Sequence, residues 1–205
     1  MSHPWNDIAL NDYENHMRLE NVYQLQTMNE MMKEQFSAYP AKSVMILGVA
    51  GGNGLEHIDP QNFRSVYGVD INPDYLNVCQ KRYSSLGDCV KPICADLSDD
   101  ALQLPCAELL IANLLIEYIG YECFQTVVRK VTPLSISCII QVNPETSFVS
   151  KSLYLHAFDR LDEVHHLIEE QELIRRMQAI GYVKELTAAK DLPNGKKFVR
   201  LDFTR

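Results

Sequence analysis

The order of segments between Ser43 and Val142 is the feature that most limits how this chain can fold. Short apolar runs typical of strands alternate there with helical or irregular segments, and the runs cover residues 43–48, 65–70, 89–96, 107–113 and 135–142. Strands that are apolar on both faces are typical of a parallel sheet with helices on both sides. We therefore predict an α/β fold with a doubly wound, mostly parallel sheet.

The segments on either side of this region carry different patterns. Apolar residues at helical spacings predict a helix over about 11–37 and another over 159–180. The turn 193–195, with the sequence Pro-Asn-Gly, separates two strand-like runs, 182–189 and 196–203. An Asn-Gly pair between two such runs indicates a β-hairpin. Two further strands, antiparallel to each other, are therefore expected at the end of a seven-stranded sheet.

Composition and charge disfavour several classes of protein. The chain has 205 residues, 46% of them hydrophobic and 22% charged, which suits a globular domain. No uninterrupted apolar run reaches the roughly 18 residues that a membrane span needs, and no secretory signal pattern is found, so we expect a cytoplasmic protein without a membrane partner. The net charge of −8 disfavours a nucleic-acid partner, because phosphate backbones repel an acidic surface.

The spacings of cysteine and histidine predict no metal site. The six cysteines include no CxxC pair and are interpreted as reduced, small core residues. His165 and His166 are adjacent, so they would point apart on the predicted helix, and both are interpreted as exposed polar residues.

A glycine-rich segment follows the first predicted strand. Residues 44–54 read VMILGVAGGNG and place four glycines within seven residues. Glycine lets a backbone approach a ligand closely, and the N–H groups at the start of a following helix would face that ligand. The segment therefore predicts a ligand-binding loop between the first strand and the next helix.

Polar residues end three of the predicted strands. Asp70 ends the second strand, Asp96 follows the third, and Asn113 closes the apolar run of the fourth. The carboxyl ends of parallel strands border one crevice, where ligands of open α/β sheets bind. A carboxylate at the end of the second strand can accept hydrogen bonds from both hydroxyls of a ribose. We expect all three side chains to face that crevice.

Taken together, these motifs resemble the class I S-adenosylmethionine-dependent methyltransferases. The resemblance rests on ILGVAGGNG, YGVDINPDYL, CADLSD, ELLIANLLIEYIG and the terminal hairpin, and it covers about residues 43–205. It implies a Rossmann-like methyltransferase fold with strand order 3-2-1-4-5-7-6, S-adenosylmethionine as cofactor and methyl transfer as the reaction. It also implies an N-terminal helical cap over residues 1–40 and a methyltransferase domain over 41–205.

The resemblance assigns cofactor contacts residue by residue. The glycine loop would pass the methionine part, Asp70 would hold the ribose hydroxyls, Asp96 would contact the adenine amino group, and Asn113 would border the methyl donor. The cofactor-binding residues implied in this way are Gly48, Ala50, Gly52, Asn53, Asp70, Ile71, Asp96, Leu97 and Asn113. A valine at Gly52 is expected to crowd the cofactor and abolish binding while the fold stays intact.

Two positions depart from the family pattern. Ile46 stands where the family often has an acidic residue two positions before the first glycine, and Ala50 replaces the usual second glycine. Ile46 removes a carboxylate that would help to hold the amino group of the cofactor, whereas Ala50 adds only a methyl group.

The acceptor side carries fewer signals, and no catalytic residue is assigned. A base is needed only where the acceptor reacts poorly while protonated. Candidate groups lie after the fourth strand, in the connection after the fifth strand and in the N-terminal segment, namely Glu117, Tyr118, His156, Tyr13 and His16. The negative charge favours a small-molecule acceptor over a nucleic acid.

Two other functions are consistent with the sequence. A nicotinamide-dependent oxidoreductase also uses a glycine turn and an acid after the second strand, but the G-x-G-x-x-G spacing fails at Ala50 or at His57. The second alternative is a methyltransferase-like fold that binds its cofactor weakly and serves as an interaction module. Ile46 is the residue that favours this alternative.

Overall fold

The computed structural model describes residues 3–143 and 148–205. Its 3-10 helices are labelled η. In chain order the elements are η1 (Pro4–Asn6), α1 (Leu10–Arg18), α2 (Gln24–Ala38), β1 (Ser43–Leu47), η2 (Leu55–His57), β2 (Ser65–Asp70), α3 (Pro73–Arg82), η3 (Ser84–Cys89), β3 (Val90–Cys94), β4 (Leu109–Asn113), α4 (Ile116–Val131), β5 (Ser135–Val142), η4 (Leu155–Glu163), α5 (Glu170–Ala179), β6 (Val183–Asp191) and β7 (Lys197–Thr204).

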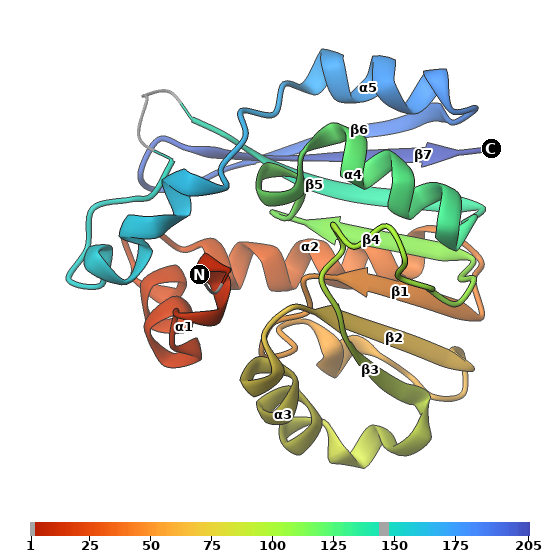
Figure 1. Cartoon of the computed structure of the whole chain (residues 1–205), viewed down its shortest axis with the longest axis horizontal. Coiled ribbons are helices and arrows are strands. Elements are labelled where there is room, and N and C mark those ends of the chain that lie inside the picture. Colours follow the sequence, from red (N-terminus) through yellow and green to blue (C-terminus); the bar gives the residue numbers. More distant parts are fainter. Residues whose placement is uncertain (1–2, 144–147) are drawn as a thin grey trace.

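The seven strands form one mixed sheet in the order β3-β2-β1-β4-β5-β7-β6 (Figure 1). Strands β1 to β5 pair in parallel with their neighbours, whereas β7 is antiparallel to both β5 and β6. This arrangement confirms the predicted sheet, its terminal hairpin and the predicted strand order. The parallel strands therefore end at one edge of the sheet, where α1 and the segment around η4 also lie (Figure 1).

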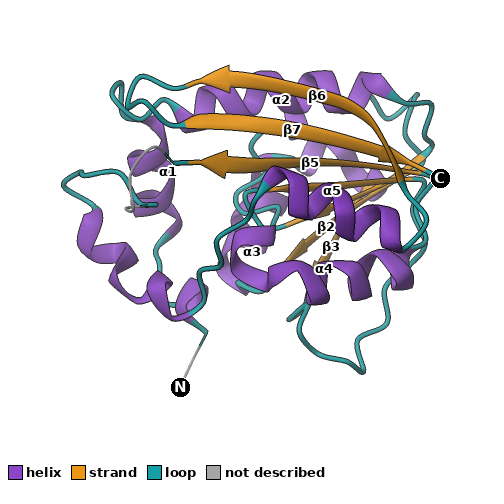
Figure 2. Cartoon of the chain, turned by 90° about the horizontal axis from the view of Figure 1, so that it is seen from above, coloured by secondary structure: helices purple, strands orange, loops and turns teal. Residues whose placement is uncertain are grey.

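Successive residues of the central strands face opposite sides of the sheet. In β1, Met45 and Leu47 pack into one core cluster with helices α4 and α5, and Val44 and Ile46 pack into another with α2 and α3. Figure 2 shows α2 on one side of the sheet and α4 and α5 on the other. Both faces are buried because helices cover both, as the continuous apolar runs of the strands predict.

A buried polar network lies between α2 and the sheet. Gln35 and Asn113 exchange two amide hydrogen bonds of 2.9 and 2.8 Å, and Gln35 also donates to Ser137 at 2.9 Å. Ser137 donates in turn to Asp202, which also accepts from Arg200 at 2.9 Å. Buried polar groups that are mutually hydrogen-bonded favour one packing arrangement. This network therefore positions α2 more specifically than apolar contacts would.

Two of the predicted helices are wrong in their extent. The segment predicted as one helix over 11–37 forms α1 and α2, because Tyr23 adopts a left-handed conformation (φ 54°) at the start of α2. The turn lets α1 lie beyond the strand ends while α2 packs against the sheet. The segment predicted as one helix over 159–180 forms η4, a non-helical stretch and α5, and Leu167 in that stretch is exposed.

Two other expectations need correction. The glycine loop is followed by the short 3-10 helix η2 instead of the extended helix that was expected. Cys94 and Cys106 are exposed, whereas the interpretation as core residues holds for Cys79 and Cys138. Helix α2 supplies several residues to the sheet's core, and residues of its first turns also line cavities at the strand ends, together with residues of η1 and α1. No helix among the described residues is long and apolar enough to cross a membrane.

Candidate active site

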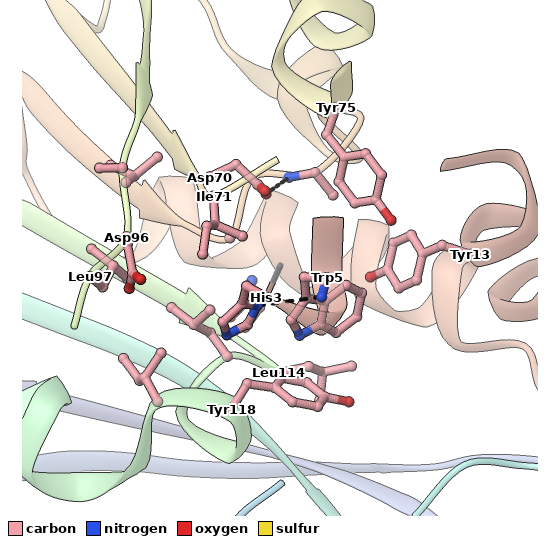
Figure 3. Close-up of a pocket in the computed structure, with 17 residues that line it drawn as sticks. His3, Trp5, Tyr13, Asp70, Ile71, Tyr75, Asp96, Leu97, Leu114 and Tyr118 are labelled. Atoms are coloured by element: carbon pink, nitrogen blue, oxygen red, sulfur yellow. Dashed lines mark hydrogen bonds between the residues drawn. The ribbon is translucent and has the colours of Figure 1, made fainter. Parts of the chain in front are cut away.

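Three adjoining cavities lie at the carboxyl ends of the parallel strands, beneath η1 and α1. The first is bordered by the tips of β1, β2, β3 and β4 and by the N-terminal segment (Figure 3). Its lining includes seven of the predicted cofactor-binding residues, namely Gly48, Ala50, Asp70, Ile71, Asp96, Leu97 and Asn113. The strand tips thus bring residues that are up to 65 positions apart in the sequence (48 to 113) around one cavity.

Asp70 is the central carboxylate of the first cavity. One of its oxygens accepts a hydrogen bond from the backbone N–H of Ala50 at 2.8 Å (Figure 3). The other accepts from the N–H of Asn72 at 2.9 Å. Burial raises the pKa of Asp70, and these backbone donors oppose that rise. A carboxylate has about four acceptor positions. Asp70 therefore fixes the glycine loop and retains acceptor capacity toward the cavity.

Asp96 and Leu97 form the side of the first cavity opposite to the α3 end (Figure 3). Oδ1 of Asp96 accepts from the backbone N–H and the hydroxyl of Ser98, at 2.9 and 2.6 Å, which closes a local turn. Asp96 is exposed and Leu97 is 8% exposed, so the pair combines an accessible acceptor with an apolar surface.

The glycine loop faces the cavity with only some of its residues. Gly48 and Ala50 line it, and the N–H groups of Gly48 and Val49 are tied to the carbonyl of Val69 at 2.8 and 3.0 Å. Gly52 does not line the first cavity, because its α-carbon faces α3, where a Cβ would lie 2.6 Å from Tyr83. The assignment of Gly52 as a residue that contacts the cofactor is therefore not supported by its position.

Asn53 also turns away from the first cavity. Its side-chain amide donates to the carbonyl of Leu25 at 3.1 Å and accepts from Asn29 at 3.1 Å, so it fastens the loop to α2. It lines a third cavity instead, together with Ile46, Gly51 and the α1 residue Glu14. Asn113 lines the first and third cavities, but its amide is already paired with Gln35.

The backbone of Ala50 is strained. Its φ is 47°, in the left-handed region that costs a residue with a side chain about 1–2 kcal/mol. We expect Ala50→Gly to raise the free energy of unfolding by about 0.5–1 kcal/mol, because the relieved strain exceeds the added entropy of the unfolded chain. Urea denaturation measures this change. The control Ala179→Gly, at the exposed last residue of helix α5 and without left-handed strain to relieve, should not raise stability. A loss of stability in Ala50→Gly would contradict the interpretation.

Several aromatic residues close the first cavity. The sequence did not indicate that they would lie together. Trp5 lies against Tyr13 and Tyr118, with ring centroids 5.7 and 4.9 Å apart in edge-to-face contacts, and Tyr13 stacks near Tyr75 at 6.3 Å (Figure 3). Tyr13 and Tyr118 are among the predicted candidates, but Trp5 and Tyr75 are not. They come from η1 and α3, and no local pattern indicates that these elements meet.

Three polar contacts hold the N-terminal segment on α3. The Asn72 amide donates to the carbonyl of Trp5 at 3.0 Å, and the Tyr75 hydroxyl donates to the carbonyl of Ile8 at 2.9 Å. Arg82 forms an ion pair with Glu14, with a second contact of 2.8 Å. These contacts fix the segment that covers the strand tips.

The three cavities meet at Tyr13 and Leu114. Both residues line the first cavity, the second cavity next to Glu117, and the third cavity next to Ile46. Leu114 has a φ of 52°, an unusual backbone conformation for a leucine at the tip of β4. Such strain persists where the surrounding structure enforces it, and it is frequent at functional sites.

Glu117 lines the second cavity and is 6% exposed. Its Oε1 accepts from the backbone N–H of Gln141 at 2.8 Å, while Oε2 is buried and receives no hydrogen bond from the described part of the chain. Burial raises the pKa of Glu117 to about 7, against the lowering effect of its backbone donors. Among the carboxyl groups of the site, Glu117 has the pKa that is shifted furthest. A carboxyl group with such a pKa can exchange a proton near neutral pH.

The candidate histidines have different positions. His16 is 4% exposed, lines the second cavity and lies 2.8 Å from the Ser152 hydroxyl, and burial lowers its pKa to about 4. His156 projects into solvent, where its ring faces Asp159, and it lines none of the three cavities, so its position does not support its candidacy. His165, interpreted as exposed, instead lines the second cavity and stacks on Phe148 with ring centroids 3.7 Å apart. Residues 3–143 and 148–205 contain no cluster of His, Cys, Asp and Glu that could hold a metal ion.

Comparison with known proteins finds likeness in structure. No protein-family model matches the sequence, and no curated protein matches it significantly. The N-methyltransferase NodS from Bradyrhizobium japonicum WM9, in complex with S-adenosyl-L-homocysteine, is similar with a TM-score of 0.66, 10% identity and 98% coverage of each chain. Magnesium protoporphyrin IX methyltransferase (ChlM) from Synechocystis PCC 6803 with bound S-adenosylmethionine has a TM-score of 0.65 and 14% identity over 99% of this chain and 88% of that one.

A third similar structure performs a different reaction. The [4+2]-cyclase SpnF has a TM-score of 0.63 and 10% identity over 87% of this chain and 80% of that one. At these identities the likeness concerns the fold, which is the class I methyltransferase fold. The cyclase illustrates that a shared fold does not determine the reaction, so function must be argued from the site.

Proposed function

We propose that this chain, which has the class I methyltransferase fold, binds S-adenosylmethionine and transfers its methyl group to a small-molecule acceptor. The observation that carries the proposal is the meeting of three cavities at Tyr13 and Leu114. The sulfur of the cofactor carries three substituents, an adenosyl group, an aminocarboxypropyl chain and the methyl group. A junction of three cavities suits such a centre, with the first cavity for the adenosyl group, the third for the amino acid chain and the second for the acceptor.

The residues of the first cavity fit an adenosyl group. The free acceptor positions of Asp70 suit the ribose hydroxyls, and Asp96 beside Leu97 suits an amino-bearing base on an apolar surface. Gly48 has a φ of 69° and no side chain, and an added Cβ would lie 3.1 Å from Leu115, so the backbone passes close to the cavity. The glycine is needed for this conformation.

The third cavity offers a different environment for the amino acid chain. Ile46 supplies no carboxylate there, but Glu14 of α1 lines the same cavity. Glu14 is paired with Arg82, which lies outside the lining of this cavity and also donates to the carbonyl of Gly51 in the glycine loop. We propose that Glu14 takes the place of the acid that the family often has where Ile46 stands, because a carboxylate complements an amino group.

The chain's contribution to the reaction would be alignment and exclusion of water. When bound, the cofactor supplies a methyl group already activated by its attachment to a positively charged sulfur. Trp5, Tyr13, Tyr75 and Tyr118 cover the strand tips and exclude solvent from the junction. Holding two reactants in line in a closed site can supply about 7–11 kcal/mol of the barrier, so no metal is needed in this scheme.

The strand order argues against the nicotinamide alternative. Dinucleotide-binding Rossmann sheets continue in parallel beyond the fifth strand, whereas here the antiparallel strand β7 lies between β5 and β6. The interaction module remains the competing proposal, and it predicts no binding of an adenosyl ligand.

Calorimetric titration tests the proposed function. We expect S-adenosylmethionine and S-adenosylhomocysteine to bind and NAD to give no heat. Asp70→Asn should weaken binding of S-adenosylhomocysteine by about 10- to 100-fold, because hydrogen bonds to a charged group are lost. Asp74→Asn, at an exposed position in the first turn of α3, should bind as the wild type does. Absence of binding to the wild type, or equal binding by Asp70→Asn, would overturn the proposal.

A further inference from the structure

We propose that the second cavity is an acceptor site for an uncharged, flat small molecule with a hydroxyl or amino group, and that Glu117 accepts its hydrogen bond and its proton. This inference rests on the proposed function for the chemistry of the donor. It goes beyond that function by naming the class of acceptor and the residue that handles the acceptor's proton.

One of the two carboxyl oxygens of Glu117, Oε2, has no hydrogen-bond partner among the described residues. The backbone N–H of Gln141 holds Oε1, which fixes the carboxyl group, but no described residue donates to the buried Oε2. Buried polar atoms are nearly always hydrogen-bonded, and each exception requires an explanation. A ligand in the cavity that Glu117 lines would supply the missing donor.

The wall of the second cavity is largely aromatic and contains no Lys or Arg among the described residues. Trp5, Tyr118, Phe148 and Phe158 present aromatic surface to it, and the His165 ring is stacked on Phe148. Such a wall suits a flat, largely apolar ligand with a few fixed polar contacts. Among the described residues that line the cavity, Glu117 is the one carboxylic acid, and none is Lys or Arg. An anionic ligand would therefore meet a carboxylate and no cation in the wall.

The second cavity adjoins the first, where the cofactor is expected. Trp5, Tyr13, Leu114 and Tyr118 line both the first and the second cavity, so a ligand in the second cavity adjoins the junction where the methyl group is expected. Glu117 lies three positions after Leu114, in the first turn of α4. The acceptor's heteroatom would form a bond to the methyl carbon as the carbon–sulfur bond breaks toward sulfur, and the heteroatom's proton would pass to Oε2.

The titratable groups around Glu117 do not neutralise it. They come from α1, α4, β5 and the stretch after η4, and are Tyr13, His16, Tyr118, Cys138 and His165. Burial lowers the pKa of both histidines and raises that of both tyrosines and the cysteine, so all five are uncharged near neutral pH. Lys196 lies beyond the wall, where its ammonium donates to the carbonyl of Phe148.

Trp5 provides a direct measurement of binding. It is the sole tryptophan of the chain and it lines the second cavity, so its fluorescence reports on ligands there. The protein is first saturated with S-adenosylhomocysteine and then titrated with phenol, catechol or aniline, and in parallel with benzoate. At pH 8 we expect the uncharged probes to bind more tightly than benzoate by about tenfold or more, because Glu117 favours donors and repels anions.

A matched pair of variants and a pH series test whether the preference for uncharged probes depends on Glu117. Glu117→Gln should reduce the preference for uncharged probes by about tenfold. Glu122→Gln, whose side chain is 91% exposed on the same helix, should behave as the wild type. In the wild type, phenol affinity should rise between pH 6 and 8 as Glu117 ionises, and this rise should be absent in Glu117→Gln.

The outcomes separate this inference from the proposed function. If S-adenosylhomocysteine binds but the probes show no preference, or Glu117→Gln equals the wild type, the acceptor assignment is wrong while the cofactor assignment stands. If S-adenosylhomocysteine does not bind, the proposed function fails, and the same probe titrations on the protein alone still decide the chemistry of the cavity. Should Glu117→Gln not fold, the pH dependence of phenol binding to the wild type decides.

Discussion

Replacing Gly52 by alanine is expected to lower the free energy of unfolding by about 3 kcal/mol, from the combined effects of backbone strain and overpacking. Gly52 has a φ of 89°, and a Cβ added there would lie 2.6 Å from the Tyr83 ring and 2.8 Å from the Cys79 sulfur. Cys79 is a buried residue of α3, so it has little freedom to move aside. Urea denaturation of the ligand-free protein measures the loss.

Gly181 provides a closely matched control for Gly52. Its φ is 90°, but a Cβ added there meets nothing within 4 Å. Gly181→Ala should therefore show only the strain of the left-handed backbone, about 1 kcal/mol. The difference between the two variants isolates the collision with α3, and equal losses would show that α3 adjusts without cost.

The position of Gly52 also argues against the expectation drawn from the sequence for Gly52→Val. The valine side chain would enter the contact between the glycine loop and α3, because Gly52 faces Tyr83 and does not line the first cavity. The larger, branched side chain should destabilise the protein more than alanine does. Any loss of cofactor binding in that variant would follow from a displaced loop, and the fold is not expected to stay intact around it.

Glu117→Gln is expected to make the ligand-free protein more stable than the wild type at pH 8, by about 3 kcal/mol. The pKa of Glu117 rises from 4.5 to about 7 in the folded protein because of burial. The folded state therefore favours the protonated carboxyl group, whose stabilising effect is complete below pH 4.5 and is lost as the pH rises through 7. Glutamine resembles the protonated form at every pH.

The measurement is the difference in unfolding free energy between variant and wild type, taken from pH 4.5 to 8. We expect this difference to be near zero at the acid end and to increase up to about pH 7. His16 acts in the opposite direction, since its lowered pKa makes the folded state less stable as the pH falls below 6.5, but it is present in both proteins and cancels. The same difference for Glu122→Gln should stay flat. A flat difference for Glu117→Gln would show that its carboxyl group is not desolvated.

The stability prediction and the binding prediction for Glu117 agree on how the site would work. A carboxylate held by one backbone donor and left without a second costs stability, as the pH experiment would show. The same feature makes the group available to a ligand, as the probe experiment would show. A stability cost at the position that handles the substrate is the usual compromise of an active site.

The sequence by itself determined the elements whose signals are local. The apolar runs of β1, β2, β4 and β5 and the Asn-Gly turn before β7 predict the sheet and its hairpin, because strand burial and turn chemistry depend on neighbouring residues. Asp70 follows from the same reasoning, since the end of a strand is also the end of its apolar run. Asn72 caps α3 by a local contact, in which its side-chain oxygen accepts from the N–H of Asp74 at 2.9 Å.

The tertiary structure alone decided the directions and partners of the remaining residues. Gly52 and Asn53 lie in the predicted loop but face α3 and α2, and the side that a loop residue faces depends on which helix packs there. Trp5 and His165 also line the cavities. Trp5 lies before the first helix that the apolar pattern predicts, and His165 lies in a segment that was wrongly predicted to be helical. Burial raises the pKa of Glu117, and segments distant in the sequence (η1, α1 and the segment around η4) line the cavity beside it, which leaves no mark on the local sequence.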